Sequence, residues 1–131
     1  IDLQLTERTT LVKKAIEDKN LKELGDLIET EALEMHSVIM SADPAVTYMK
    51  GASSSLLAWI RKTRAAGNLP AYFTMDAGPN VHLICERKNA EAIAEAVKTN
   101  FNNFEIIIDV IGKGPVLSTN YNQDRKVDAW T

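Results

Sequence analysis

The chain has 131 residues, of which 45% are hydrophobic and 25% charged, a composition typical of one compact soluble domain. Its net charge of -3 argues against a nucleic-acid-binding arm or a patch for anionic membranes, because both need clustered positive charge. The single cysteine, Cys85, excludes a disulfide framework and a cysteine-built zinc site, and it fits a reducing cytoplasmic compartment. No apolar run approaches the ~20 residues that span a bilayer, so we expect no membrane partner.

Two helical segments are predicted from apolar residues that recur every three or four positions. Residues 11–16 carry a short apolar stripe, which a polar break at residues 18–20 ends. Asn20 is then the expected N-cap of a second helix that runs to about Met40. The apolar face of this helix is formed by Leu21, Leu24, Ile28, Ala32, Met35 and Ile39.

A third helix is predicted after the interruption at residues 41–44. Asp43 is the expected N-cap, and Pro44 stands at the first helical position, where its missing N–H loses no helical hydrogen bond. The apolar period continues across Gly51, and Gly67 stands where a helix would end in the left-handed conformation.

The second half of the chain changes to short β segments. Residues 71–75 and 81–85 predict two strands of a hairpin joined by a wide loop. Asn89 is the expected cap of a further helix, and residues 104–111 predict a strand with a nearly continuous apolar centre. This order of elements favours an α+β fold, in which an antiparallel sheet packs against helices.

The most unusual stretch is the loop Asp76-Ala77-Gly78-Pro79-Asn80, which follows an apolar strand. Gly78 lets backbone approach a ligand closely and Pro79 fixes the turn, so such a loop can hold the Asp76 carboxylate rigidly. An Asp in this place also commonly caps a turn by bonding its own backbone two residues on. The residues alone leave both roles open.

The string from Phe73 to Val81 resembles the signature loop of the mevalonate diphosphate decarboxylase family, a branch of the GHMP kinase superfamily. Other segments resemble the family in the same order, namely Met35-His36, residues 44–48, Arg64 and residues 109–115. We therefore expect residues 1–117 to form a GHMP-kinase-like carboxy-terminal domain, with residues 118–131 as a polar extension.

The resemblance implies an ATP-dependent decarboxylation of mevalonate 5-diphosphate to isopentenyl diphosphate, in isoprenoid biosynthesis. It implies that Asp76 contacts the substrate 3-hydroxyl, with Ala77 and Gly78 as substrate-binding neighbours in the loop. The Asp76 carboxylate would either accept the hydroxyl proton or orient the hydroxyl and stabilise an electron-poor carbon. The resemblance also implies a cytoplasmic homodimer.

The family's ATP site lies in an amino-terminal domain with a serine-rich phosphate loop, so ATP and Mg²⁺ would be bound mainly there. The stretch Gly51-Ala52-Ser53-Ser54-Ser55 imitates that loop, but it lies between helical segments and we interpret it as a helix start. Because the chain also begins with Ile1 instead of Met, we expect a piece of a longer protein that is inactive alone.

Two other interpretations remain open. The chain resembles, less closely, the carboxy-terminal domain of another GHMP-type kinase, although those usually carry a glycine-run turn where this chain has Asp76 to Asn80. Alternatively, it is a stand-alone α+β binding or dimerisation module without catalytic activity.

The remaining candidates have simpler structural explanations. His36 is expected to be packed and hydrogen-bonded inside the fold, and His82 to face solvent. Cys85 is expected to be a small core residue, because no His and carboxylate spacing marks it as a nucleophile. Glu105 and Asp109 share one face of the predicted strand and imitate a metal site, but an exposed polar face is the more common arrangement.

Overall fold

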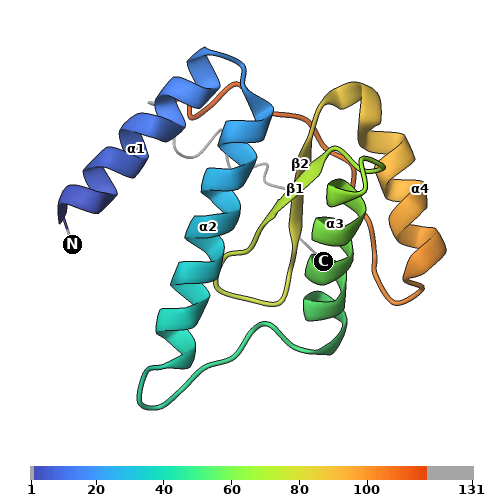
Figure 1. The fold of residues 1–131 in the computed structure, drawn as a ribbon, viewed down its shortest axis with the longest axis horizontal. Coiled ribbons are helices and arrows are strands. Elements are labelled where there is room, and N and C mark those ends of the chain that lie inside the picture. The colour runs from blue at the N-terminus through green and yellow to red at the C-terminus, as the bar shows by residue number, and fades with distance from the viewer. Residues whose placement is uncertain (1, 118–131) are drawn as a thin grey trace.

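The computed structural model describes residues 2–117, so the predicted extension at residues 118–131 lies outside the described residues. The elements follow in the order α1 (Asp2–Glu17), α2 (Leu21–Met40), α3 (Gly51–Ala65), β1 (Ala71–Thr74), β2 (His82–Cys85), the 3-10 helix η1 (Arg87–Asn89) and α4 (Ala90–Asn100). Helix α1 packs on α2, and the hairpin lies between α2 and α3, with α4 on the far side of α3 in Figure 1. The predicted α+β fold, with an antiparallel sheet against helices, is confirmed.

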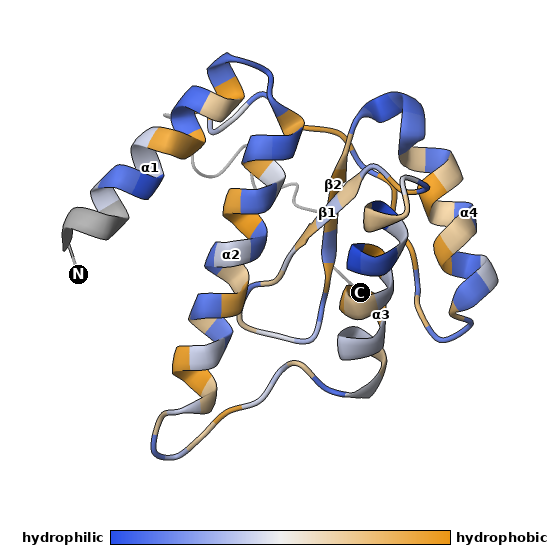
Figure 2. Ribbon diagram, in the orientation of Figure 1, coloured by the Kyte–Doolittle hydropathy of each residue, from blue (hydrophilic) through white to orange (hydrophobic). Residues whose placement is uncertain are grey.

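Helix α2 forms as its sequence predicts. The Asn20 side chain accepts a hydrogen bond from the backbone N–H of Glu23 at 3.1 Å, which satisfies one of the free donors at the helix start. Apolar and polar residues alternate along α2 and α4 in Figure 2, the pattern of helices that bury one face. The fully buried stripe of α2 is nevertheless formed by Gly25, Glu29, Ala32 and His36, and of the predicted apolar positions only Ala32 belongs to it.

The hydrophobic core lies between β1, α3 and α4. Strand β1 pairs with β2 in antiparallel register, with Phe73 opposite Leu83. Phe73 is fully buried, as is Ile60 of α3, and Ile93 of α4 packs in the same cluster. Burial of these side chains is the main force that holds the hairpin against the two helices.

The predicted start of the third helix is wrong. Helix α3 begins at Gly51, and the preceding residues 41–50 are irregular, so Asp43 and Pro44 do not open a helix. Gly51, the first residue of α3, has a φ of +44°, which the interior of a right-handed helix does not contain, so no helix can run into α3 from the N-terminal side. The serines after Gly51 do lie at a helix start, and Gly67 adopts the expected positive φ, at 78°.

The predicted strand at residues 104–111 is wrong. Residues 101–117 have no regular secondary structure. Phe104 packs against the core, but Ile107 is 82% exposed and Ile111 fully exposed. A strand needs a neighbour whose backbone groups pair with its own, and in the described part of the chain the sheet pairs β1 with β2 alone.

Two smaller predictions, on the Asn89 cap and on Glu105 and Asp109, are also wrong in part. Helix α4 starts after Asn89 as predicted, yet the Asn89 side chain makes no capping hydrogen bond, since η1 leads directly into the helix. Glu105 and Asp109 are exposed on the irregular segment instead of sharing a strand face.

Candidate functional site

The candidate site is the loop that follows β1, where Asp76 leaves the core. Met75 is buried, with 1% of its surface exposed, whereas the next residue, Asp76, is exposed. Among the described residues, Asp76 has no hydrogen bond or ion pair, so the turn-capping bond that Asp commonly makes is absent. Within the part of the chain that the structure describes, the loop therefore leaves a carboxylate without protein partners directly beside the core.

The loop backbone takes a shape that its glycine permits. Gly78 has a φ of +147°, which side chains other than glycine rarely allow. Ala77 is exposed and Gly78 is half-buried, so the two predicted neighbours of Asp76 lie at the surface of the same loop.

Helix α3 reaches this loop through a serine. The Ser53 hydroxyl donates a hydrogen bond of 2.9 Å to the carbonyl oxygen of Pro79, across 26 residues of sequence. Ser53 is 6% exposed, and its neighbours Ser54 and Ser55 are exposed. The sequence marks all three serines as a helix start and does not single out the one that contacts the loop.

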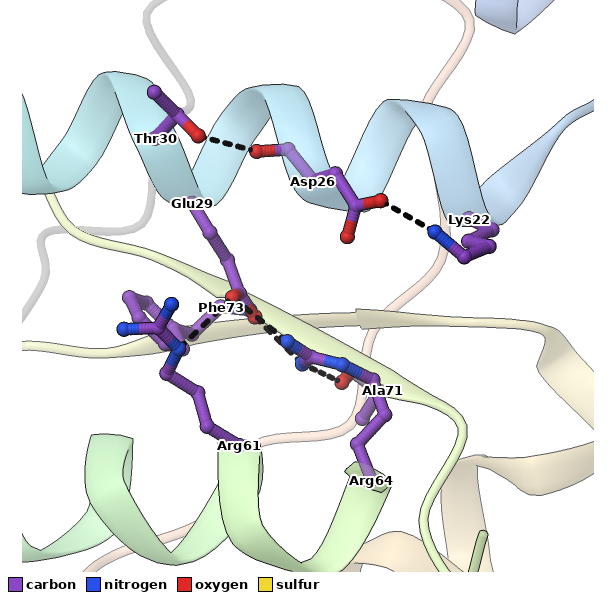
Figure 3. A network of polar contacts seen from close by, with 8 residues as sticks. All are labelled: Lys22, Asp26, Glu29, Thr30, Arg61, Arg64, Ala71 and Phe73. Atoms are coloured by element: carbon purple, nitrogen blue, oxygen red, sulfur yellow. Dashed lines mark hydrogen bonds and ion pairs between the residues drawn. The ribbon is translucent and has the colours of Figure 1, made fainter.

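A buried ion pair holds the strand that leads to the loop (Figure 3). Glu29 of α2 is bound in two places by the guanidinium of Arg64 of α3, at 2.7 and 2.8 Å. The same carboxylate accepts the backbone N–H of Phe73 at 3.2 Å, and Arg64 donates to the carbonyl oxygen of Ala71 at 2.7 Å. The two charged side chains thus satisfy backbone groups of β1 that the pairing with β2 leaves free.

Tyr72 fits between this ion pair and α2. A Cβ atom built on Gly25 would lie 2.0 Å from Cγ of Tyr72, so only a glycine lets the ring pack this closely against the helix. The Arg64 guanidinium stands over the same ring, 4.2 Å from its centroid, in cation–π geometry. Strand β1 is therefore fixed to α2 and α3 by packing as well as by charge.

Nothing in the local sequence pattern marks Glu29 or Ser53 as a residue that positions the strand or the loop. One signal that Glu29 is paired was its position on the same side of α2 as Gly25 and Ala32. A charged side chain on a buried helix face is normally paired. Arg64 belongs to the segments that resemble the family, but its partner Glu29 lies 35 residues away, too far for a local pattern to reveal the pair.

His36 is deeply buried, with 1% of its surface exposed, and its ring meets Tyr48 edge-on at a centroid distance of 6.1 Å. The expected packing is confirmed. The expected hydrogen bonds are not found, because within the described residues neither ring nitrogen has a partner. His82 is exposed, as predicted.

Cys85 is half-buried on β2. Burial raises the pKa of the Cys85 thiol, and the nearby carboxylate of Glu86 raises it further. A reactive cysteine needs the opposite shift, so Cys85 has the character of a structural residue.

The part of the chain from residue 2 to 117 offers no group of three or more His, Cys, Asp or Glu side chains that could hold a metal ion. The same described residues include no helix long and apolar enough to cross a membrane.

Known proteins similar to this chain belong to the family that the loop from Phe73 to Val81 resembles. The family model of the mevalonate 5-diphosphate decarboxylase C-terminal domain matches residues 2–130. The chain is 41% identical to the mevalonate diphosphate decarboxylase of Staphylococcus aureus, with a TM-score of 0.69, over 75% of this chain and 29% of that one. A solved complex of MDDEF with MVAPP, AMPPCP and magnesium is 39% identical, with a TM-score of 0.69, over 75% of this chain and 30% of that one.

Among curated relatives, the diphosphomevalonate decarboxylase of Aspergillus fumigatus is 25% identical over 93 residues, which are 70% of this chain and 23% of that protein. The chain thus spans about a quarter of that relative's length. The resemblance seen in the sequence is confirmed by these matches, and the chain belongs to the family of mevalonate 5-diphosphate decarboxylase C-terminal domains.

Proposed function

We propose that this chain is the carboxy-terminal domain of an ATP-dependent decarboxylase that converts mevalonate 5-diphosphate to isopentenyl diphosphate, and that Asp76 contacts the substrate 3-hydroxyl. The observation that carries the proposal is the Asp76 carboxylate, which has no protein partner among residues 2–117 and stands at the end of a buried strand in a chain of this family. A carboxylate that protein donors had already satisfied would have little capacity left to accept a substrate hydroxyl.

The reaction divides into two steps. The oxygen of the tertiary 3-hydroxyl attacks the γ-phosphorus of ATP, ADP leaves, and the hydroxyl proton passes to a base or to solvent. The C3–O bond then breaks and phosphate departs with the electron pair. The bond between C2 and the carboxylate carbon supplies the electrons of the new double bond, and carbon dioxide is released.

Asp76 contributes to these two reaction steps through its position and its negative charge. Accepting a hydrogen bond from the 3-hydroxyl aims its oxygen at the γ-phosphorus, as in-line transfer requires. A negative charge beside C3 also stabilises the positive charge that develops as phosphate leaves. We therefore assign Asp76 orientation and electrostatic stabilisation as its main contributions, ahead of proton abstraction.

The rest of the site belongs to polypeptide outside this chain. We propose that an amino-terminal domain of the same protein binds most of the ATP and Mg²⁺, and that the isolated chain is inactive. The share of solved relatives that this chain spans, about 30%, supports a larger protein around it. The solved complex of one relative with AMPPCP and magnesium supports ATP and Mg²⁺ as ligands of that larger protein. A cytoplasmic location and a homodimer are part of the same proposal and rest on the single cysteine and on the family resemblance.

The test uses the full-length protein that contains this chain. Asp76→Asn and Asp76→Ala should each lower turnover by at least about 10²-fold, because they remove the charge that orients and stabilises. Asp26→Asn, which neutralises an exposed carboxylate on α2, is the matched control and should retain activity. Release of carbon dioxide and of phosphate from mevalonate 5-diphosphate is measured together with the melting temperature.

Near-normal turnover of Asp76→Asn would remove Asp76 from the mechanism. A stable phosphorylated alcohol without carbon dioxide would instead identify a kinase of the same superfamily. Binding of ATP by the isolated chain at micromolar concentration would contradict the assignment of the nucleotide site to another domain.

A further inference from the structure

We propose that Ser53 is a positioning residue for Asp76, and that it acts by holding the loop through the carbonyl oxygen of Pro79. This inference rests on the proposed function and adds a residue that the comparisons with relatives do not assign. It gives one serine of the Gly51-to-Ser55 stretch a role toward the acidic loop of the same chain.

The Ser53 hydroxyl is committed to this contact by its surroundings. Ser53 is 6% exposed, and a buried hydroxyl without a partner is unfavourable. The carbonyl of Pro79 is the partner that its Oγ finds, at 2.9 Å. Without this contact, the Ser53 hydroxyl would be buried with no hydrogen bond, because Ser53 and not the exposed Pro79 is the buried partner.

The contact fixes the far end of the loop. On the near side, Met75 is buried in the core, which anchors the backbone immediately before Asp76. On the far side, Gly78 has a φ of +147° and adds little stiffness of its own, because glycine has access to many backbone conformations. The hydrogen bond to Pro79 supplies the second anchor, so Asp76 stands between two fixed points.

The helix that carries Ser53 is itself held in place. Its first turn starts at Gly51, and the backbone N–H of Ser53 bonds to the carbonyl of Lys50 at 3.0 Å. Leu56 and Leu57, one turn later, are buried in the core. The loop is thus tied to a rigid part of the fold.

Loss of this anchor should affect the chemistry more than the fold. A displacement of about 1 Å at a reacting group can lower the rate by about 10²-fold, whereas the loss of one hydrogen bond typically lowers stability by about 0.5–1.5 kcal/mol, which leaves the domain folded. We therefore expect Ser53→Ala to reduce kcat at least about tenfold, with the KM for ATP nearly unchanged.

The experiment compares five forms of the full-length protein, which are the wild type, Ser53→Ala, Ser53→Thr, Ser54→Ala and Ser55→Ala. The two last variants remove exposed hydroxyls from the same helical turn and should keep wild-type kcat within twofold. Ser53→Thr keeps a hydroxyl at the same place and should recover most of the activity that Ser53→Ala loses. A Ser53→Ala variant that matches Ser54→Ala in kcat would overturn the inference.

A second measurement separates positioning from a general structural role. In an Asp76→Asn background, Ser53→Ala should cause little further loss, because the group that it positions is already gone. An equal fold-loss in both backgrounds would mean that Ser53 acts independently of Asp76, and it would refute the inference.

Backbone order parameters test the contact without any reliance on activity. The order parameters of the Ala77, Gly78 and Asn80 amides should be lower in Ser53→Ala than in the wild type, while those of the core strands stay unchanged. Unchanged order parameters in the loop would overturn the positioning role even in an active enzyme. If the wild-type protein releases no carbon dioxide but the loop amides respond as expected, the proposed function fails and the contact stands.

Discussion

The ion pair between Glu29 and Arg64 allows a quantitative test of how β1 is held. The substitution Glu29→Ala removes a carboxylate that is 5% exposed and leaves the Arg64 guanidinium, 20% exposed, without its partner. It also leaves the backbone N–H of Phe73 without an acceptor. Three hydrogen bonds to one charged group are lost by the removal of a single side chain.

The magnitude follows from burial. Removal of one partner of a buried ion pair typically destabilises a protein by about 3–5 kcal/mol, because the remaining charge is uncompensated. Arg64 keeps some contact with water and still donates to Ala71, so we expect a loss near the lower end, about 3 kcal/mol. With a urea m-value of about 2 kcal/mol/M, the unfolding midpoint should fall by about 1.5 M.

The assay is urea unfolding of the 131-residue chain, followed by circular dichroism. Asp26→Ala is the matched control, since Asp26 lies on the same helix and pairs with Lys22 at the surface, where water and salt screen the attraction. Its midpoint should match the wild type. Glu29→Gln keeps an acceptor for Phe73 but loses the charge, and it should fall between the two.

The reasoning fails if Glu29→Ala is no less stable than Asp26→Ala. A double-mutant cycle adds a second check, because Glu29→Ala and Arg64→Ala should couple by about 1–3 kcal/mol if the contact is direct. Strictly additive effects would show that the two side chains stabilise the fold independently of one another.

Three further predictions concern single positions. Gly25→Ala should lower the melting temperature by about 8 °C, because its methyl group would overlap the Tyr72 ring. The overlap costs about 2 kcal/mol, which outweighs the better helix propensity of alanine. A higher melting temperature would contradict this. The Cys85 thiol should react with iodoacetamide at a higher pH than a free cysteine, because burial disfavours the thiolate. Glu86→Gln should move the midpoint of the pH profile down, because the Glu86 carboxylate also raises the thiol pKa. A midpoint that does not move would exclude the carboxylate as a cause of the raised pKa. Asn20→Ala should destabilise the chain by about 1 kcal/mol in urea unfolding, and Asn20→Ser should recover it; equal stability of all three forms would show that the cap contributes nothing.

Local signals in the sequence predicted most of the secondary structure. Helix α2 follows from the Asn20 cap and a regular apolar period, and the hairpin follows from two β-rich runs around a turn-forming loop. These features depend on residues close in sequence, so a pattern of caps, periods and turn residues is sufficient to reveal them. The same is true of Gly67, where a positive φ ends the region of α3.

Local sequence patterns gave wrong predictions where the structure of a segment depends on residues far away in the sequence or on a single backbone angle. The run at residues 104–111 has the composition of a strand, but a strand forms only against a neighbour, and the described residues provide none for it. Across Gly51 the apolar period suggested one continuous helix, whereas the glycine's backbone angle separates a loop from α3.

What the sequence determined by itself was the family signature of the Asp76 loop and the elements on either side of it. Tertiary structure alone decided how that loop is held, through Ser53 from 26 residues away and through Glu29, which meets Phe73 from 44 residues away. The physical reason is that hydrogen bonds and ion pairs depend on separation in space. The chain brings these groups together only when α2, α3 and β1 pack against one another.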